Sequence, residues 1–232
     1  MKYKNLFFDL DDTLWAFSVN AQETFEEIYD NLDLKRFFDS FKQFYSIYQK
    51  RNMELWKSYE VGGITKDELN HQRFRYPLDS VGVDDSVLAG KIRDEFFSII
   101  ATKKRLMPYA REILETLAPR FHLYILSNGF RELQCKKMCS AGIDGYFEKT
   151  ILSDDIGMNK PKPEIFYFAL SATQSELRDS LLIGDSWKAD MVGAKEVGMD
   201  QTFYNVADLK DFPFRPTFVI DDLRELVEIL EK

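Results

Sequence analysis

Cysteine and histidine are scarce in this chain, which has two of each among its 232 residues. Cys135 and Cys139 lie four residues apart in a segment with a helical pattern, where we expect reduced thiols that pack against their neighbours. A zinc site would need further Cys or His ligands close by, and the histidines are His71 and His122. The composition therefore argues against both a disulfide framework and a zinc site.

Long apolar runs and excess positive charge are missing as well. No stretch approaches the roughly 20 apolar residues that cross a bilayer, and the N-terminus leads into a core strand rather than a signal sequence. The net charge of −8 would repel the phosphate backbone of a nucleic acid. We therefore expect a cytoplasmic protein that binds neither membranes nor nucleic acid polymers. The acidic charge does not decide the oligomeric state, for which we expect a monomer or a small homo-oligomer.

Core-forming residues are abundant. The chain is 45% apolar and contains 20 Phe and 11 Tyr, which excludes disorder and provides enough material for a large buried core. Its length fits one large domain or two unequal ones.

The second half of the chain alternates short apolar runs with amphipathic segments. This alternation predicts an α/β fold with a doubly wound parallel sheet, a Rossmann-like core. The predicted strands are Lys4–Leu10, Phe121–Leu126, Thr150–Leu152, Leu181–Ile183, Gln201–Tyr204 and Phe218–Ile220. The predicted helices are Tyr109–Leu117, Arg131–Ala141, Lys162–Ala172, Ala189–Val197 and Leu223–Leu230.

Residues 15–103 contain no convincing strand and show long helical periodicity, with an aromatic stripe at residues 37, 41, 44, 45 and 48. We predict an inserted α-helical cap domain at 15–103 and a catalytic core formed by 1–14 and 104–232. The cap would sit above the C-terminal edge of the sheet, where such folds bind ligands. For the stripe we favour packing within the cap over stacking on a substrate.

The clearest chemical signal follows the first strand, where apolar residues 6–8 lead directly into Asp9, Asp11, Asp12 and Thr13. Side chains two apart at a strand end begin on one face, so Asp9 and Asp11 can surround one small volume. Crowded carboxylates at neutral pH call for protons or a counter-cation, and hard oxygen ligands suit Mg²⁺. A turn rich in Asp is the alternative.

Other strand ends carry matching polar groups. Ser127 and Asn128 follow the second strand and offer a hydroxyl and an amide, although both could also cap a helix. Lys160 opens the run Lys-Pro-Lys-Pro before a helix and could neutralise carboxylates and hold a phosphate oxygen, whereas a solvated lysine is the ordinary alternative. Asp185 and Asp190 follow the strand at 181–183 and could complete an oxygen cage for Mg²⁺, or Asp185 could simply cap a helix.

This ordered set resembles the motifs of the haloacid dehalogenase-like hydrolase superfamily across nearly the whole chain, and the helical insertion resembles its small C1-type cap. The resemblance implies a phosphomonoester hydrolase that forms an aspartyl-phosphate, with Asp9 as nucleophile and Asp11 as general acid/base. It also implies Mg²⁺ as cofactor. The implied metal ligands are Asp9, the Asp11 carbonyl and Asp185, with Asp190 in support, and the implied phosphate ligands are Ser127, Asn128 and Lys160.

The superfamily's dehalogenases lack the second Asp because a departing halide needs no proton, so the presence of Asp11 argues against that activity. The cap carries a spaced pattern of residues at positions 52, 55, 56, 59, 62 or 63, 64, 65, 69, 73 and 74. This pattern resembles bacterial house-cleaning 5′-nucleotidases, which act on nucleoside monophosphates with a leaning toward pyrimidines. The candidates for contact with the base or sugar are Asn52, Trp56, Tyr59 and Arg73. Helix packing is the alternative for these residues.

Two other functions remain open. A phosphatase of another small phosphorylated metabolite, such as a sugar phosphate or phosphoglycolate, would use the same core with a different cap. An inactive binding or regulatory protein could keep the scaffold, although such a protein would not need both Asp9 and Asp11.

Overall fold

The computed structural model describes residues 2–231. They form two compact units, which we call the α/β unit and the helical unit. The α/β unit combines the N-terminal segment up to Phe17 with the chain from Lys104 onward, and the helical unit is Ser18–Lys103. Within the described residues, no helix has both the length and the apolar character needed to span a membrane.

The α/β unit is built on a six-stranded, wholly parallel sheet with the order β3-β2-β1-β4-β5-β6. The strands are β1 (Asn5–Phe8), β2 (His122–Ser127), β3 (Lys149–Leu152), β4 (Ser180–Gly184), β5 (Asp200–Tyr204) and β6 (Phe218–Ile220). All six predicted strands are present, which confirms the doubly wound α/β core. The chain order reverses at β1, so β2 and β4 flank the first strand, and the carboxyl ends of all three lie at one edge.

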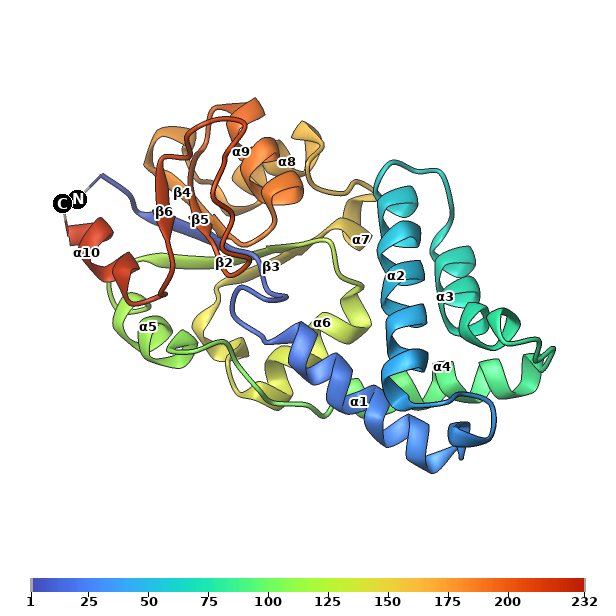
Figure 1. Ribbon diagram of the computed structural model, residues 1–232. Helices are drawn as coiled ribbons and strands as arrows, with labels where there is room; N and C mark the ends of the chain where they lie inside the picture. The colour runs from blue at the N-terminus through green and yellow to red at the C-terminus, as the bar shows by residue number, and fades with distance from the viewer. Residues whose placement is uncertain (1, 232) are drawn as a thin grey trace. The chain divides into compact units, whose positions relative to one another are not determined.

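Helices cover both faces of this sheet, with α8 and α9 on one side and α5 and α6 on the other (Figure 1). The helices of this unit are α5 (Ala110–Leu117), α6 (Arg131–Ala141), α7 (Ser153–Ile156), α8 (Pro163–Thr173), α9 (Gly193–Val197) and α10 (Glu225–Glu231). Short 3₁₀ turns occupy Asp144–Tyr146 and Leu177–Asp179. The predicted helix at 189–197 begins instead with a π-helical turn, Trp187–Val192, and the short α7 was not predicted.

The core under α8 shows why these segments pair. Phe7 on β1 is fully buried among Ile165, Phe166 and Ala169 of α8 and Leu182 of β4. Apolar side chains at positions that a strand or helix places on one face leave water together, and each large side chain contributes about 1.5–3 kcal/mol.

The helical unit comprises most of α1 (Phe17–Asn31) together with α2 (Phe41–Glu60), α3 (Lys66–Ser80), α4 (Ser86–Ile100) and a 3₁₀ turn at Leu34–Arg36. Phe25 lies at the centre of its aromatic core, 4.1 Å from Tyr48 and 5.0 Å from Phe96 between ring centroids. Phe44 and Tyr45 of the aromatic stripe are buried in the same core, which agrees with the packing interpretation.

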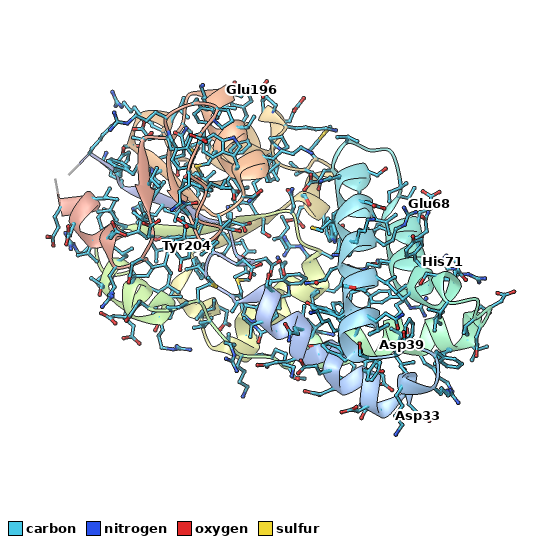
Figure 2. The ribbon with its side chains drawn as sticks, in the orientation of Figure 1. Asp33, Asp39, Glu68, His71, Glu196 and Tyr204 are labelled. Atoms are coloured by element: carbon cyan, nitrogen blue, oxygen red, sulfur yellow. The ribbon has the colours of Figure 1, made fainter. Side chains whose placement is uncertain are left out.

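Helix ends in this unit follow local rules. Thr65 caps α3 by accepting the Glu68 N–H, and the Glu68 carboxylate accepts the Thr65 N–H in return. Glu68 and His71 both lie on this helix (Figure 2).

The free cysteines lie on α6 of the α/β unit. Both are exposed, so the expectation that Cys135 and Cys139 are packed is wrong.

Candidate active site

Asp9 stands at the carboxyl end of β1, in the middle of the sheet. Its N–H donates to the Ile183 carbonyl at 2.9 Å, so the β1–β4 pairing extends up to this residue. The Asp9 side chain is nearly buried, and carboxylate oxygens of Asp9, Asp185 and Asp190 all lie within 4.8 Å of one another. Strand pairing thus gathers acids from sequence positions about 180 residues apart into one cluster.

Lys160 is buried among these acids. Its ammonium donates to Asp9 Oδ1 at 2.8 Å and to Asp190 Oδ1 at 2.6 Å, and the side chain is 1% exposed. The solvated-lysine alternative is therefore excluded. One ammonium faces two carboxylates, so Asp9, Asp190 and Lys160 together carry a net negative charge when all three are ionised.

The Asn128 side chain fixes the Lys160 backbone from both sides. Its Nδ2 donates to the Lys160 carbonyl at 2.9 Å, and its Oδ1 accepts the Lys160 N–H at 2.7 Å. The sequence placed Asn128 among the phosphate ligands, whereas this side chain bonds to the segment that carries Lys160.

Burial and crowding change the pKa values here. Burial, reinforced by the charges of Asp190 and Asp11, raises the pKa of Asp9 to about 7. These effects together outweigh Lys160, which lowers it. Burial, followed by the charges of Asp9 and Asp190, raises the pKa of Asp185 well above its usual range. Burial would lower the pKa of Lys160, but the neighbouring carboxylates more than reverse this and raise it.

Asp185 and Asp190 are held by residues of the segments that follow β1 and β4. The Thr13 hydroxyl donates to Asp185 Oδ1 at 2.8 Å and accepts the Asp185 N–H at 3.1 Å. Asp190 Oδ2 accepts the Ser186 N–H at 3.0 Å, and a Cβ on Gly184 would stand 2.3 Å from that oxygen. The glycine is therefore required for the close approach of Asp190.

Asp11 has partners that sequence reasoning did not identify. Its carboxylate accepts from Lys137 Nζ at 2.8 and 3.1 Å and from Gln134 Nε2 at 2.9 Å. Gln134 also donates to Ser127 Oγ at 2.9 Å, and that oxygen accepts the Gly129 N–H at 3.2 Å. Because Ser127 Oγ accepts two hydrogen bonds, its own hydrogen is available for an anion.

The sequence of α6 contains a local sign that Gln134 and Lys137 are buried. The helical pattern of 131–141 places residues 134, 137, 138 and 141 on one face, and the structure buries all four. Two of them, Gln134 and Lys137, are polar. A lysine and a glutamine on the buried face of a predicted helix call for buried partners, although the sequence does not say which.

The donor set fits a hard divalent cation. Three carboxylates converge within 4.8 Å, two of them buried, and hold more negative charge than the single Lys160 compensates. Oxygen-only ligands of this kind match Mg²⁺ in preference to softer metals.

The four candidates in the helical unit lie on α2 and α3. Arg73 is 3% exposed, donates to Asn70 Oδ1 at 2.6 Å, and places its guanidinium 4.7 Å from the Phe74 ring centroid. Trp56 and Tyr59 form an edge-to-face pair 5.6 Å apart and are only partly buried. Asn52 is also partly buried, and its Oδ1 has no hydrogen-bond partner.

Comparisons with known proteins agree with this geometry. A family model described as haloacid dehalogenase-like hydrolase matches residues 3–198. Pyrimidine 5′-nucleotidase YjjG of Escherichia coli is 29% identical to the chain, with the whole of both chains covered. A glyceraldehyde 3-phosphate phosphatase of Pyrococcus abyssi is 31% identical, over 87% of this chain and 81% of the relative.

A solved structure extends the likeness to the fold. The crystal structure of YfnB from Bacillus subtilis, described as bound to magnesium, superimposes with a TM-score of 0.90 at 27% identity and covers all of both chains. The family match spans most of the chain, so it applies to the protein as a whole rather than to one motif.

Proposed function

The chain belongs to the haloacid dehalogenase-like hydrolases, and from that premise we propose that it hydrolyses nucleoside 5′-monophosphates through an aspartyl-phosphate on Asp9. One observation carries the proposal. The buried Asp9 carboxylate is fixed by Lys160 beside Asp185 and Asp190, with a second carboxylate, Asp11, two residues away. This arrangement provides a nucleophile, a cation for phosphate oxygens and an acid/base.

In the first step, an Asp9 oxygen attacks phosphorus, the ester P–O bond breaks, and Asp11 gives its proton to the departing alkoxide. In the second step, water attacks the phosphorus of the aspartyl-phosphate while Asp11 takes a proton from that water. The bond to Asp9 breaks, releasing phosphate and restoring both carboxyl groups.

Phosphate oxygens would be held by the Ser127 hydroxyl and the Lys160 ammonium, with Asn128 keeping the Lys160 segment in place. Asp9, the Asp11 carbonyl and Asp185, supported by Asp190, would hold Mg²⁺. When bound, the metal would offset the repulsion between the anionic phosphate and these carboxylates.

The substrate class rests on resemblance. YjjG is named a pyrimidine 5′-nucleotidase and covers the full chain, which supports nucleoside monophosphates, with pyrimidines foremost. The relative from Pyrococcus abyssi is named a glyceraldehyde 3-phosphate phosphatase, so a phosphorylated small metabolite such as a sugar phosphate is the second candidate.

The test is phosphate release from a panel of nucleoside monophosphates, sugar phosphates and small phospho-acids, with Mg²⁺ and with EDTA. We expect metal-dependent release concentrated on deoxypyrimidine monophosphates. Release concentrated on sugar phosphates or phospho-acids would favour the second candidate. If a folded protein releases phosphate from none of the compounds, the result would favour a binding protein without catalytic activity.

Substrate choice by the helical unit is tested with Trp56→Ala and Tyr59→Ala. If these rings contact the base, kcat/KM for the best nucleotide falls roughly tenfold or more while that for p-nitrophenyl phosphate is retained. The exposed Met53, on the same helix, gives the matched control Met53→Ala. Arg73 is a poorer probe because its removal would also disturb the aromatic core.

A further inference from the structure

Lys137 is an unusual residue to find on the buried face of a helix. Its side chain is 2% exposed, and its ammonium makes a two-oxygen contact with the Asp11 carboxylate. The same nitrogen lies 4.7 Å from the Trp15 ring centroid and 5.0 Å from that of Phe17. Aromatic faces and a carboxylate surround this ammonium, so its position is well defined.

Gln134, one turn earlier on α6, is fully buried and uses one nitrogen for two acceptors, Asp11 Oδ2 and Ser127 Oγ. This nitrogen cannot be exchanged with the amide oxygen, because the Asp11 carboxylate needs a donor. The amide therefore links the acid/base carboxyl to the hydroxyl that is available for a phosphate oxygen.

Asp11 itself sits on the loop after β1, and its side chain is 29% exposed. A loop carboxylate with two free torsions would ordinarily sample several rotamers. Three hydrogen bonds from two buried donors on one helix select a single position. Proton transfer depends steeply on such placement, since a misplacement of about 1 Å can cost on the order of 100-fold in rate.

We infer that Lys137 and Gln134 are positioning residues that fix the Asp11 carboxyl next to Ser127, so that α6 sets the geometry of proton delivery to the leaving oxygen. The inference rests on the proposed function, because it gives Asp11 the role of acid. Neither residue touches the phosphoryl group in this account, and both act through Asp11.

The test compares two leaving groups in Lys137→Met, which keeps an apolar stem against Trp15 and Phe17. One substrate is the alkyl phosphate of the panel that the wild type hydrolyses fastest, whose alkoxide needs a proton. The other is p-nitrophenyl phosphate, whose phenolate leaves without one. We expect kcat/KM to fall roughly 100-fold for the alkyl phosphate and to stay within about fivefold for the aryl phosphate.

The ratio kcat/KM is the right quantity because it covers steps only up to departure of the leaving group, so slow hydrolysis of the phospho-enzyme does not affect it. Lys137→Arg keeps the charge and donors and is expected to recover most of the alkyl activity. Lys136→Met, on the exposed side of the same helix, is the matched control. Gln134→Met removes the hydrogen bonds to both Asp11 and Ser127, so some activity is lost on both substrates, but the alkyl phosphate should lose clearly more. This variant serves if Lys137→Met does not fold.

Equal losses on both substrates, or no loss on either, would overturn the inference. A crystal structure of Lys137→Met gives a readout that needs no activity: the Asp11 carboxyl should move by about 1 Å or more, or occupy several rotamers. An unmoved Asp11 would also overturn it. A wild type that hydrolyses nothing would refute the proposed function alone, since the displacement of Asp11 can still be measured.

Discussion

At the scale of single residues, the site is a set of buried charges that compensate one another. Lys160 neutralises part of the Asp9, Asp185 and Asp190 cluster, and Lys137 is paired with Asp11. Removing one partner of such a pair is costly because the other charge stays buried. The consequences of substitution therefore depend on which charge is left without a partner.

Asp9→Asn removes the proposed nucleophile and keeps the size of the side chain. We expect turnover to fall about a thousandfold or more, because an amide cannot form the aspartyl-phosphate. Phosphate release measures the loss, and an unchanged circular dichroism spectrum and melting temperature show that the fold is intact. Substantial activity in this variant would contradict the mechanism.

Lys160→Met leaves two carboxylates without their cation. In EDTA near neutral pH, we expect the free energy of unfolding to fall by about 3–5 kcal/mol, measured by urea denaturation. The exposed Lys162, two residues later, provides the control Lys162→Met, which should change stability by less than about 0.5 kcal/mol. Similar stability of the two variants would argue against charge compensation by Lys160.

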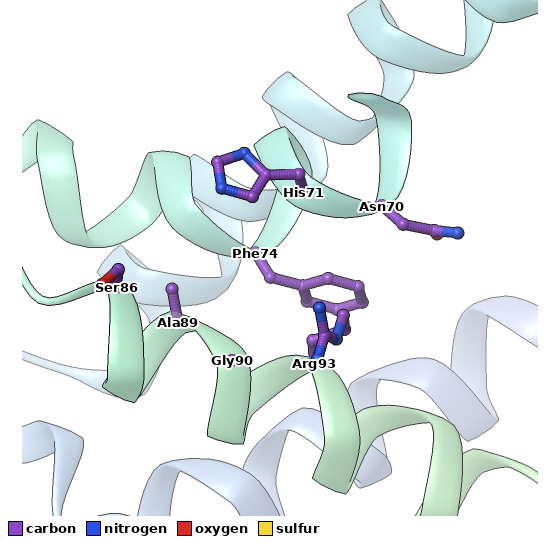
Figure 3. Close-up of a pocket in the computed structure, with 7 residues that line it drawn as sticks. All are labelled: Asn70, His71, Phe74, Ser86, Ala89, Gly90 and Arg93. Carbon is purple, nitrogen blue, oxygen red and sulfur yellow. The ribbon is translucent and has the colours of Figure 1, made fainter. Parts of the chain in front are cut away.

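At the scale of elements, the end of β4 decides where Asp190 can stand. Gly184 leaves no room for a side chain, since a Cβ would lie 2.3 Å from Asp190 Oδ2 and 2.4 Å from its Cγ. Gly90, in contrast, has room for a side chain, because a Cβ there would meet nothing within 4 Å. It lies on α4 beside a small pocket that His71 and Arg93 also line (Figure 3).

These two glycines give opposite predictions for the same substitution. Gly184→Ala should destabilise the protein by about 1–3 kcal/mol and abolish most activity, because Asp190 must move away from Lys160. Gly90→Ala should stabilise α4 by about 0.5–1 kcal/mol and leave activity unchanged, because alanine is the better helix former. Thermal melts and phosphate release check both, and a harmless Gly184→Ala would refute the close-packing argument.

At the scale of the whole molecule, the carboxylate cluster couples stability to pH and to metal. The pKa of Asp9 is raised from 3.8 to about 7 in the folded state, and that of Asp185 is raised as well. The folded protein therefore holds protons that the unfolded chain releases. The resulting stabilisation is fully present below pH 3.8 and is lost as the pH rises through about 7.

We accordingly expect the melting temperature in EDTA to fall between about pH 5 and pH 8, by roughly 2–4 °C for each kcal/mol lost. Mg²⁺ should raise it more at the higher pH, because fewer protons then compete for the carboxylates. Differential scanning fluorimetry across this range measures both effects. Asp9→Asn should weaken the pH dependence, and an equal Mg²⁺ shift at both ends would contradict the coupling.

Much of this molecule is determined by its sequence alone. Alternating apolar and amphipathic segments are local patterns, and they predicted all six strands and most helices of the α/β unit. Asp9 and Asp185 were also identifiable, because each directly follows a buried strand and the two meet if those strands are neighbours in the sheet. Asp190 comes five residues after Asp185 and was identified with it. The aromatic stripe likewise indicated a packed helical unit.

The tertiary structure decided which partner each side chain has. Lys137 meets Asp11 across 126 residues of sequence, and Asn128 meets the Lys160 backbone across 32. Arg73, a candidate for substrate contact, lies in the aromatic core of its own unit. Periodicity reports which face of an element is buried, whereas the identity of a partner depends on how distant segments pack, and only the assembled fold contains that information.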